Sequence, residues 1–230
     1  RQRVQPIVYT LSAGVGEVGF RGLQLARIDS LQIGELVIEN VPSLIKNPPL
    51  GGMPRRETES FSPLAAGLSI RIDYDRRRLT LGRHLDASQA DVELPLRVHR
   101  LATVRGKINN ERDASFVVDT GGEVISLSAA AASTIETQPM TRSFPLKVYG
   151  SSGWDPEAFL LPGVNLMFDS ISFNNYPVVV LDLHAPSALL GFELGGIIGH
   201  DFLKRYLVDF DLYKSVIRLA HRSSAAVSSD

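Results

Sequence analysis

The sequence predicts an all-β protein made of two related lobes with one or two short helices. Short runs rich in Val, Ile, Leu, Phe and Tyr recur between turn signals, and many of them alternate polar and apolar residues. Such alternation has the two-residue period of a strand with one buried face. In addition, segments that look alike recur at a nearly constant offset along the chain. These observations favour a duplicated β fold.

The strand candidates follow one another with few interruptions. In chain order they are residues 6–11, 31–38, 68–74, 78–82, 94–101, 102–108, 115–120, 144–150, 165–173, 176–183, 206–212 and 215–220. Helix composition occurs in two places, 126–136 and 200–207. The Pro- and Gly-containing stretch 46–62 and the polar stretch 84–93 are expected to be a loop and a linker.

Composition excludes several classes of function. The chain has 230 residues, and Lys plus Arg against Asp plus Glu gives 24 − 25 = −1. A near-neutral balance offers no electrostatic reason to expect nucleic acid as a partner. No apolar run approaches the roughly 18 residues of a membrane span, and without Cys there is no thiolate chemistry. Because the chain opens without Met and almost inside a strand-like run, we expect Arg1 to be a cut end.

The internal similarity rests on three matches. "IRIDYDRRRLTL" aligns with "VDFDLYKSVIRL", which puts Asp73 on Asp211 at an offset of 211 − 73 = 138. "IDSLQIG" from Ile28 aligns with "FDSISFN" from Phe168, an offset of 140, and "QPIVYTLSAG" from Gln5 resembles "FPLKVYGSSG" from Phe144, an offset of 139. The sequence therefore predicts two copies of one β unit.

The copies divide the chain unequally. We expect residues 1–83 to be the rear part of a first lobe, 84–220 a complete second lobe and 221–230 a flexible tail. A counterpart of Asp119 in the first copy would fall near 119 − 139 = −20, upstream of Arg1.

One motif carries the chemistry. "FVVDTGG", Phe116 to Gly122, ends an apolar run with a carboxylate, and "GGIIGHDFLKRYLVDFD" begins at Gly195. Together with the duplication, these segments resemble the retropepsin/pepsin-like aspartic peptidases, and they look closest to bacterial members. The resemblance implies a pepsin/retropepsin-like acid protease fold in which Asp119 is catalytic and the Gly196–Gly199 strand supports it.

The resemblance also implies a carboxyl pair. Two carboxyl groups held close together share one proton, so that one acts as a base toward water and the other as an acid. Thr120 and Gly121 are expected to brace Asp119, with Gly122, Ile197, Ile198 and Gly199 as further support. Gly122 departs from the family, which commonly has Ala or Ser there. The first copy has Thr58-Glu59-Ser60-Phe61 where the second has Gly196-Ile197-Ile198-Gly199.

A second candidate feature is a flap over the substrate. "VYGSSGW" has a Gly-Ser-Ser-Gly turn between possible strands, and an ordinary hairpin is an equally good interpretation. The candidate substrate-binding residues are Tyr149, Gly150, Ser151, Ser152, Gly153 and Trp154. Val8 to Gly16 would be the corresponding flap of the first copy.

Other polar residues have simpler interpretations. Asp119 alone could be a turn residue before Gly-Gly. Asp73 and Asp211 are expected to have structural strand or turn roles, and His200 a capping or surface role. No His, Asp and Glu grouping has metal-ligand spacing, so we expect neither a metal nor a cofactor.

The sequence thus predicts an aspartic endopeptidase acting on peptides or proteins. Two alternatives stay open: a catalytically silent peptide-binding or assembly module, and a homodimer that pairs Asp119 with its counterpart in a second copy. The second carboxylate would come from the missing N-terminal part of the first lobe or from that second copy, so that inactivity of this chain alone is compatible with the prediction. The family resemblance implies a periplasmic or secreted, soluble bacterial protein.

Overall fold

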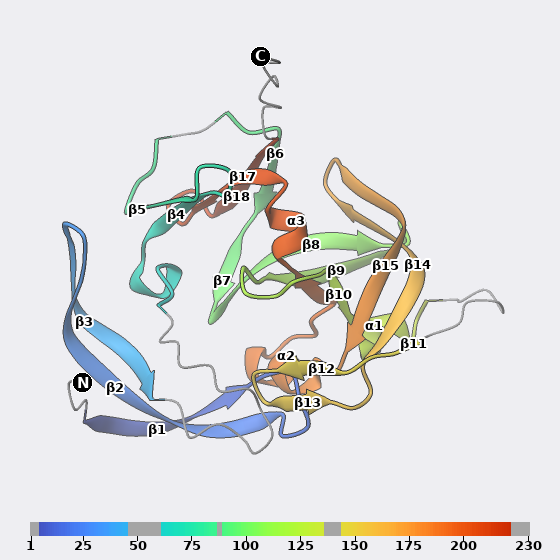
Figure 1. Cartoon of the computed structure of the whole chain (residues 1–230), viewed down its shortest axis with the longest axis horizontal. Helices are drawn as coiled ribbons and strands as arrows, with labels where there is room; N and C mark the ends of the chain where they lie inside the picture. Colours follow the sequence, from blue (N-terminus) through green and yellow to red (C-terminus); the bar gives the residue numbers. More distant parts are fainter. Residues whose placement is uncertain (1–4, 46–60, 87–88, 136–143, 222–230) are drawn as a thin grey trace, which may run out of the picture.

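The described part of the chain comprises residues 5–45, 61–86, 89–135 and 144–221 of a computed structural model, and strands dominate it (Figure 1). The predicted all-β class is confirmed. The strands form four sheets, of three, eight, two and five strands.

The largest sheet forms the body of the second half of the chain. Its order is β11 (Phe144–Pro145), β14 (Phe159–Phe168), β15 (Ile171–Leu181), β10 (Ser126–Ser128), β16 (Gly196–Ile198), β9 (Arg112–Val118), β8 (Leu101–Ile108) and β7 (Arg97–His99). Because β14 also pairs with β8, the sheet closes on itself. Phe116 and Phe168 meet edge to face inside it, with ring centroids 4.9 Å apart. A Cβ on Gly106 would lie 2.5 Å from the Phe168 ring, so only glycine fits there.

The five-stranded sheet joins the two halves of the chain. Its order is β5 (Arg78–Gly82), β4 (Ser69–Asp73), β17 (Tyr206–Asp211), β18 (Val216–His221) and β6 (Val92–Pro95). Within the β4–β5 hairpin Arg71 lies opposite Thr80, and within the β17–β18 hairpin Asp209 lies opposite Arg218. Adding 138 to the residue numbers of the first pair gives those of the second pair. The same offset relates every other pair of opposite residues in the β4–β5 hairpin to a pair in the β17–β18 hairpin.

The turns of these two hairpins also correspond. The Asp73 carboxylate accepts a hydrogen bond from the backbone N–H of Arg76, and the Asp211 carboxylate accepts one from the N–H of Lys214. The last turn residues, Arg77 and Ser215, both have positive φ. Asp73 and Asp211 thus have the structural contacts expected from their places in the sequence.

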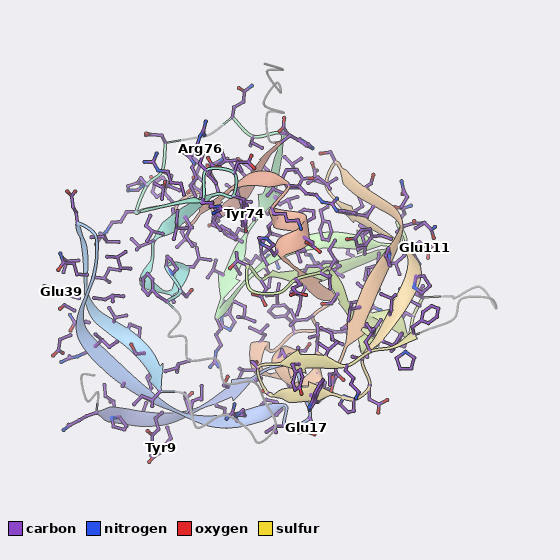
Figure 2. The ribbon with its side chains drawn as sticks, in the orientation of Figure 1. Tyr9, Glu17, Glu39, Tyr74, Arg76 and Glu111 are labelled. Carbon is purple, nitrogen blue, oxygen red and sulfur yellow. The ribbon has the colours of Figure 1, made fainter. Side chains whose placement is uncertain are left out.

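The first part of the chain forms a three-stranded sheet, β1 (Pro6–Ala13), β2 (Phe20–Ile33) and β3 (Leu36–Ile45). It lies along one side of the molecule, and Tyr9 on its outer surface is 77% exposed (Figures 1 and 2). The two-stranded sheet consists of β12 (Val148–Gly150) and β13 (Gly153–Asp155).

The described residues hold three short α-helices, one more than the sequence indicated. They are α1 (Ala129–Ala132), α2 (His184–Leu190) and α3 (His200–Leu203), with a 3-10 turn, η1, at Leu64–Ala66. The segments 126–136 and 200–207 each contain one of them. The helix α2 was missed, although Pro186 in its first turn and Gly191 with positive φ after its end are typical helix signals.

Two predicted strands are hairpins. The segment 165–173 turns at Asp169 and Ser170 between β14 and β15, and the segment 31–38 turns at Gly34 and Glu35 between β2 and β3. The predicted match between Ile28 and Phe168 therefore puts Asp29, inside β2, on the turn residue Asp169. The segments that begin at Ile28 and Phe168 therefore do not occupy equivalent places in the structure.

Some predictions fall outside the described residues. These are most of the loop 46–62, the tail 222–230, and Thr58 to Ser60 of the first-copy counterpart of Gly196–Gly199. No helix in the described part of the chain is long and apolar enough to cross a membrane.

Candidate active site

Asp119 lies where the buried strand β9 reaches the surface. Phe116, Val117 and Val118 are at most 9% exposed, whereas Asp119 is exposed. The strand pairs in parallel with β16, and the backbone N–H of Asp119 donates to the carbonyl of Ile198 at 3.0 Å. The strand thus carries a carboxylate from the core to one fixed point on the surface.

The glycines after Asp119 fix the direction of its side chain. The N–H of Gly121 donates to Oδ1 of Asp119 at 2.9 Å, and the N–H of Gly122 donates to the Asp119 carbonyl at 3.3 Å. A Cβ on Gly122 would lie 3.4 Å from Oδ2 of Asp119, which is ordinary contact. Gly122 therefore leaves room for the small side chains that the family commonly has there.

The β16 strand supports this turn from beneath. Ile198 is 1% exposed, and a Cβ on Gly196 would lie only 2.0 Å from the Ser126 carbonyl oxygen. A Cβ on Gly199 would lie 2.5 Å from the Val124 carbonyl oxygen. Beyond the strand, the N–H of His200 donates to the Gly122 carbonyl at 2.6 Å. The two glycines let three backbone segments approach each other closely around Asp119.

The predicted bracing contact of Thr120 is not seen in the described part of the chain. The Thr120 side chain is exposed, and the described residues give it no hydrogen-bond partner. In the same part of the chain, no hydrogen bond or ion pair joins Asp119 to a second carboxyl group. His200 contacts the first half of the chain, because its ring meets that of Tyr74 edge to face at 5.1 Å.

The predicted flap is a two-stranded hairpin near the same sheet. Strands β12 and β13 pair Tyr149 with Trp154 and turn at Ser151 and Ser152. At its base, Val148 packs against a buried cluster that includes Val117 and is also contacted by Ile197. The hairpin is therefore attached close to the strands that hold Asp119, and Gly150, Ser151, Ser152 and Gly153 form its tip.

The tip of this hairpin is bonded to the loop between β1 and β2. The N–H of Ser152 donates to the Val15 carbonyl at 2.9 Å, the N–H of Val18 to the Ser152 carbonyl at 3.2 Å, and the N–H of Glu17 to the Trp154 carbonyl. Figure 1 shows the two segments side by side. This contact was missed from the sequence. The glycines at positions 14, 16, 19, 150 and 153 were its only signal.

The glycines allow this close approach. A Cβ on Gly150 would lie 2.0 Å from the Val15 carbonyl oxygen, and a Cβ on Gly14 would lie 1.9 Å from Oγ of Ser151. Gly16 has φ +132°, which L side chains rarely adopt. The predicted flaps of the two copies, Val8–Gly16 and Tyr149–Trp154, thus meet at their tips.

Comparison with known proteins agrees with this geometry. The Aspartyl protease family model matches residues 104–202, which run from β8 to α3 and include Asp119, the β12–β13 hairpin and Gly196–Gly199. Residues 104–202 are therefore similar in sequence to aspartyl proteases. No curated protein matches.

Two solved structures are similar to part of this chain. The EIAV protease in complex with the inhibitor HBY-793 is 20% identical, with a TM-score of 0.34 over 45% of this chain and 86% of that one. A retropepsin-like aspartic protease from Rickettsia conorii is 16% identical, with a TM-score of 0.38 over 56% of this chain and 88% of that one.

The described residues contain no group of three or more His, Asp or Glu side chains that could hold a metal ion. A cavity of about 420 Å³ lies between the start of α1 and α2. Its lining includes Ser128, Leu183 and Phe192, and does not include Asp119.

Proposed function

We propose that this protein is an aspartic endopeptidase in which Asp119 is one of two carboxyl groups that activate water. The observation that carries the proposal is the Asp119 carboxylate, exposed at the end of a buried strand and oriented by the Gly121 N–H at 2.9 Å. The rigid support by β16 and the nearby flap hairpin fit the same role.

The proposed chemistry needs two carboxyl groups with one proton between them. The ionised group takes a proton from a water molecule, whose oxygen attacks the carbonyl carbon of the peptide bond. The protonated group donates its proton to the carbonyl oxygen. Collapse of the tetrahedral intermediate breaks the C–N bond, and the leaving nitrogen takes up a proton. An extended substrate would lie between Asp119 and the hairpin tips.

We further propose that the chain consists of the rear part of a first lobe, 1–83, and a complete second lobe, 84–220. The shared register of the β4–β5 and β17–β18 hairpins supports this division. The first-lobe hairpin occupies the position beside β17 that a two-fold related copy would need. This favours the N-terminal part of the first lobe, over a second copy, as the source of the other carboxyl group.

Activity on a peptide library tests the proposal. The wild-type protein should cleave the library, and a pepstatin-type inhibitor should block this cleavage. The Asp119→Asn variant should have lost the cleavage activity. Asp113→Asn is the matched control, because Asp113 is an exposed residue of the same strand at its far end. If the second carboxyl group belongs to an upstream segment, the chain alone will not cleave the library until that segment is supplied. Equal cleavage by wild type and Asp119→Asn would overturn the proposal.

A silent peptide-binding or assembly module is the second candidate. The observation that favours it is that Asp119 has no carboxyl partner in the described part of the chain. Such a module would bind peptides without cleaving them, even with the upstream segment present. A homodimer pairing Asp119 across copies would instead sediment at twice the mass of the 25.1 kDa chain. The periplasmic or secreted location stays a prediction from the family resemblance.

A further inference from the structure

A ring contact joins the neighbourhood of Asp119 to the first half of the chain. Tyr74 lies in the turn between β4 and β5 (Figure 2) and meets the ring of His200 edge to face, with centroids 5.1 Å apart and planes at 77°. Both side chains are half-buried, and Tyr74 also packs against the buried cluster that includes Phe202. An edge-to-face pair favours one relative orientation of its two rings, so Tyr74 restricts where His200 can lie.

Backbone hydrogen bonds continue this contact to the carboxylate. The N–H of His200 donates to the Gly122 carbonyl at 2.6 Å, and the N–H of Gly122 donates to the Asp119 carbonyl at 3.3 Å. Within the same turn, the N–H of Gly121 donates to Oδ1 of Asp119 at 2.9 Å. A displacement of the His200 backbone is therefore passed to the peptide groups that orient the Asp119 side chain.

The duplication does not supply this contact. Subtracting 138 from His200 gives Ser62, and adding 138 to Tyr74 gives Leu212. Neither counterpart has an aromatic ring, so the ring pair belongs to only one of the two related sides, the side that carries Asp119. The contact is thus an addition to the arrangement that the two copies share.

We propose that Tyr74 is a positioning residue for Asp119 and acts through the ring of His200. Tyr74 holds His200, His200 holds the Gly122 peptide group, and the turn then keeps Oδ1 of Asp119 on the Gly121 N–H. This inference rests on the proposed function, in which the direction of the carboxylate controls the rate of water attack. A misplacement of about 1 Å at a reacting group can slow a reaction about 100-fold.

One test needs no catalysis. The amide proton signal of Gly121 in NMR spectra should shift as Asp119 loses its proton, because this amide donates to Oδ1, and Asp119→Asn should abolish the shift. Tyr74→Leu should reduce the amplitude of the shift by at least about half, since a misaligned hydrogen bond weakens steeply. Tyr74→Phe keeps the ring and should retain the full amplitude. A merely structural role of Tyr74 would lower the melting temperature and leave this amplitude unchanged.

The second test measures peptide cleavage, with the N-terminal part of the first lobe supplied if wild type requires it. Tyr74→Leu should lower kcat about tenfold and leave KM within about twofold, and Tyr74→Phe should have the kcat of wild type. Tyr213→Leu is the matched control, because Tyr213 in the β17–β18 turn forms a similar pair with His84, at 4.9 Å and 79°, that does not involve His200. This control should change neither kcat nor the Gly121 amplitude.

The outcomes distinguish this inference from the proposed function. Cleavage by wild type, with kcat and the Gly121 amplitude both unchanged in Tyr74→Leu, would overturn the role of Tyr74 and leave the peptidase proposal standing. Equal losses in Tyr74→Leu and Tyr213→Leu would also overturn that role. Wild type that cleaves nothing even with the first lobe completed would overturn both. His200→Leu, which removes the other ring and keeps the backbone N–H, gives the same test if Tyr74→Leu does not fold.

Discussion

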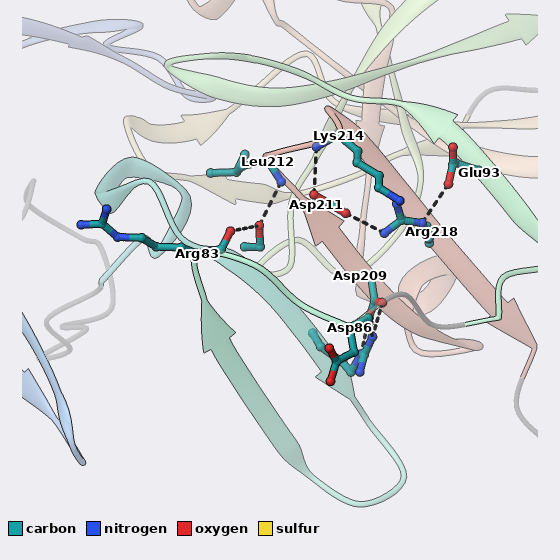
Figure 3. A network of polar contacts seen from close by, with 10 residues as sticks. Arg83, Asp86, Glu93, Asp209, Asp211, Leu212, Lys214 and Arg218 are labelled. Atoms are coloured by element: carbon teal, nitrogen blue, oxygen red, sulfur yellow. Dashed lines mark hydrogen bonds and ion pairs between the residues drawn. The ribbon is translucent and has the colours of Figure 1, made fainter.

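Arg71 and Asp209 correspond to each other in the two hairpins, since 209 − 71 = 138, and they form an ion pair with each other. They lie opposite one another where β4 pairs with β17. The Nε and one terminal nitrogen of Arg71 each donate to Asp209, both at 2.7 Å; Figure 3 shows Asp209 within the polar network of this sheet. The approximate two-fold axis that relates the two hairpins thus passes close to this ion pair, whose two residues are 138 positions apart in the sequence.

Removing one partner should destabilise the junction more than removing both. The Asp209 side chain is 1% exposed and that of Arg71 is 25% exposed. Arg71→Met leaves a buried carboxylate without its cation and should lower the free energy of unfolding by about 3 kcal/mol. Arg71→Met with Asp209→Leu should recover much of that loss. Urea unfolding of the four proteins measures the coupling, and additive effects would contradict a direct interaction.

Stability should depend on pH through Asp211. Burial alone would raise the pKa of this carboxyl group, but hydrogen bonds from the Lys214 N–H and from Arg218 outweigh burial and lower the pKa below its ordinary value of 3.8. A lowered pKa in the folded state adds stability above the ordinary pKa, and this stability is lost as the pH falls through the folded value. Unfolding free energies should therefore fall below about pH 4, and Asp211→Asn should flatten that slope.

The exposed Asp29 provides a comparison, because its side chain is 89% exposed and its ion pair with Arg27 is a surface one. Asp29→Asn should leave the slope unchanged. Equal slopes in wild type and Asp211→Asn would show that other carboxyl groups govern acid unfolding.

Glycines around Asp119 should differ in their tolerance of a side chain. Gly196→Ala would put a Cβ 2.0 Å from a backbone oxygen and should cost at least about 3 kcal/mol. Gly122→Ala meets Asp119 only at contact distance and should change stability by less than about 1 kcal/mol. Melting temperatures of the two variants provide the measurement. If Gly196→Ala left the melting temperature unchanged, β10 and β16 would have to lie further apart than they do in this structure.

The contact between the two hairpin tips should fail without its glycine. A Cβ at position 150 would lie 2.0 Å from the Val15 carbonyl oxygen, so Gly150→Ala should separate the β12–β13 tip from the β1–β2 loop. Amides of Glu17, Val18 and Ser152 should then exchange at least about tenfold faster, since opening becomes easier. Gly22→Ala is the control, because nothing lies within 4 Å of its Cβ position. Unchanged exchange in Gly150→Ala would contradict the contact.

The sequence predicted the parts of this fold that depend on local pattern. Alternation placed most strands, and the apolar run before Asp119 correctly indicated a buried strand. The hairpin turn at Asp169 was missed because Asp-Ser continues the alternation of the strands around it, and only its positive φ of 54° distinguishes it. The helix α2 was missed because its seven residues carry no clear apolar period.

Contacts between distant segments could not be predicted in the same way. The family resemblance led us to expect the Gly196–Gly199 strand beside Asp119, but the parallel pairing of β9 with β16 was not predicted. The Arg71–Asp209 pair needed the orientation of two hairpins, which no local pattern specifies. The contact between hairpin tips depends on glycines that are equally compatible with ordinary turns.

The most direct test of the account concerns the Asp119 carboxyl group. Cleavage of a peptide library should be measured for wild type, Asp119→Asn and Asp113→Asn, each with and without the polypeptide segment encoded upstream. The account predicts cleavage by wild type and Asp113→Asn under at least one of these conditions, and a loss of at least about 1,000-fold in Asp119→Asn. Cleavage that survives in Asp119→Asn, or wild type that cleaves nothing even with the upstream segment, would contradict it.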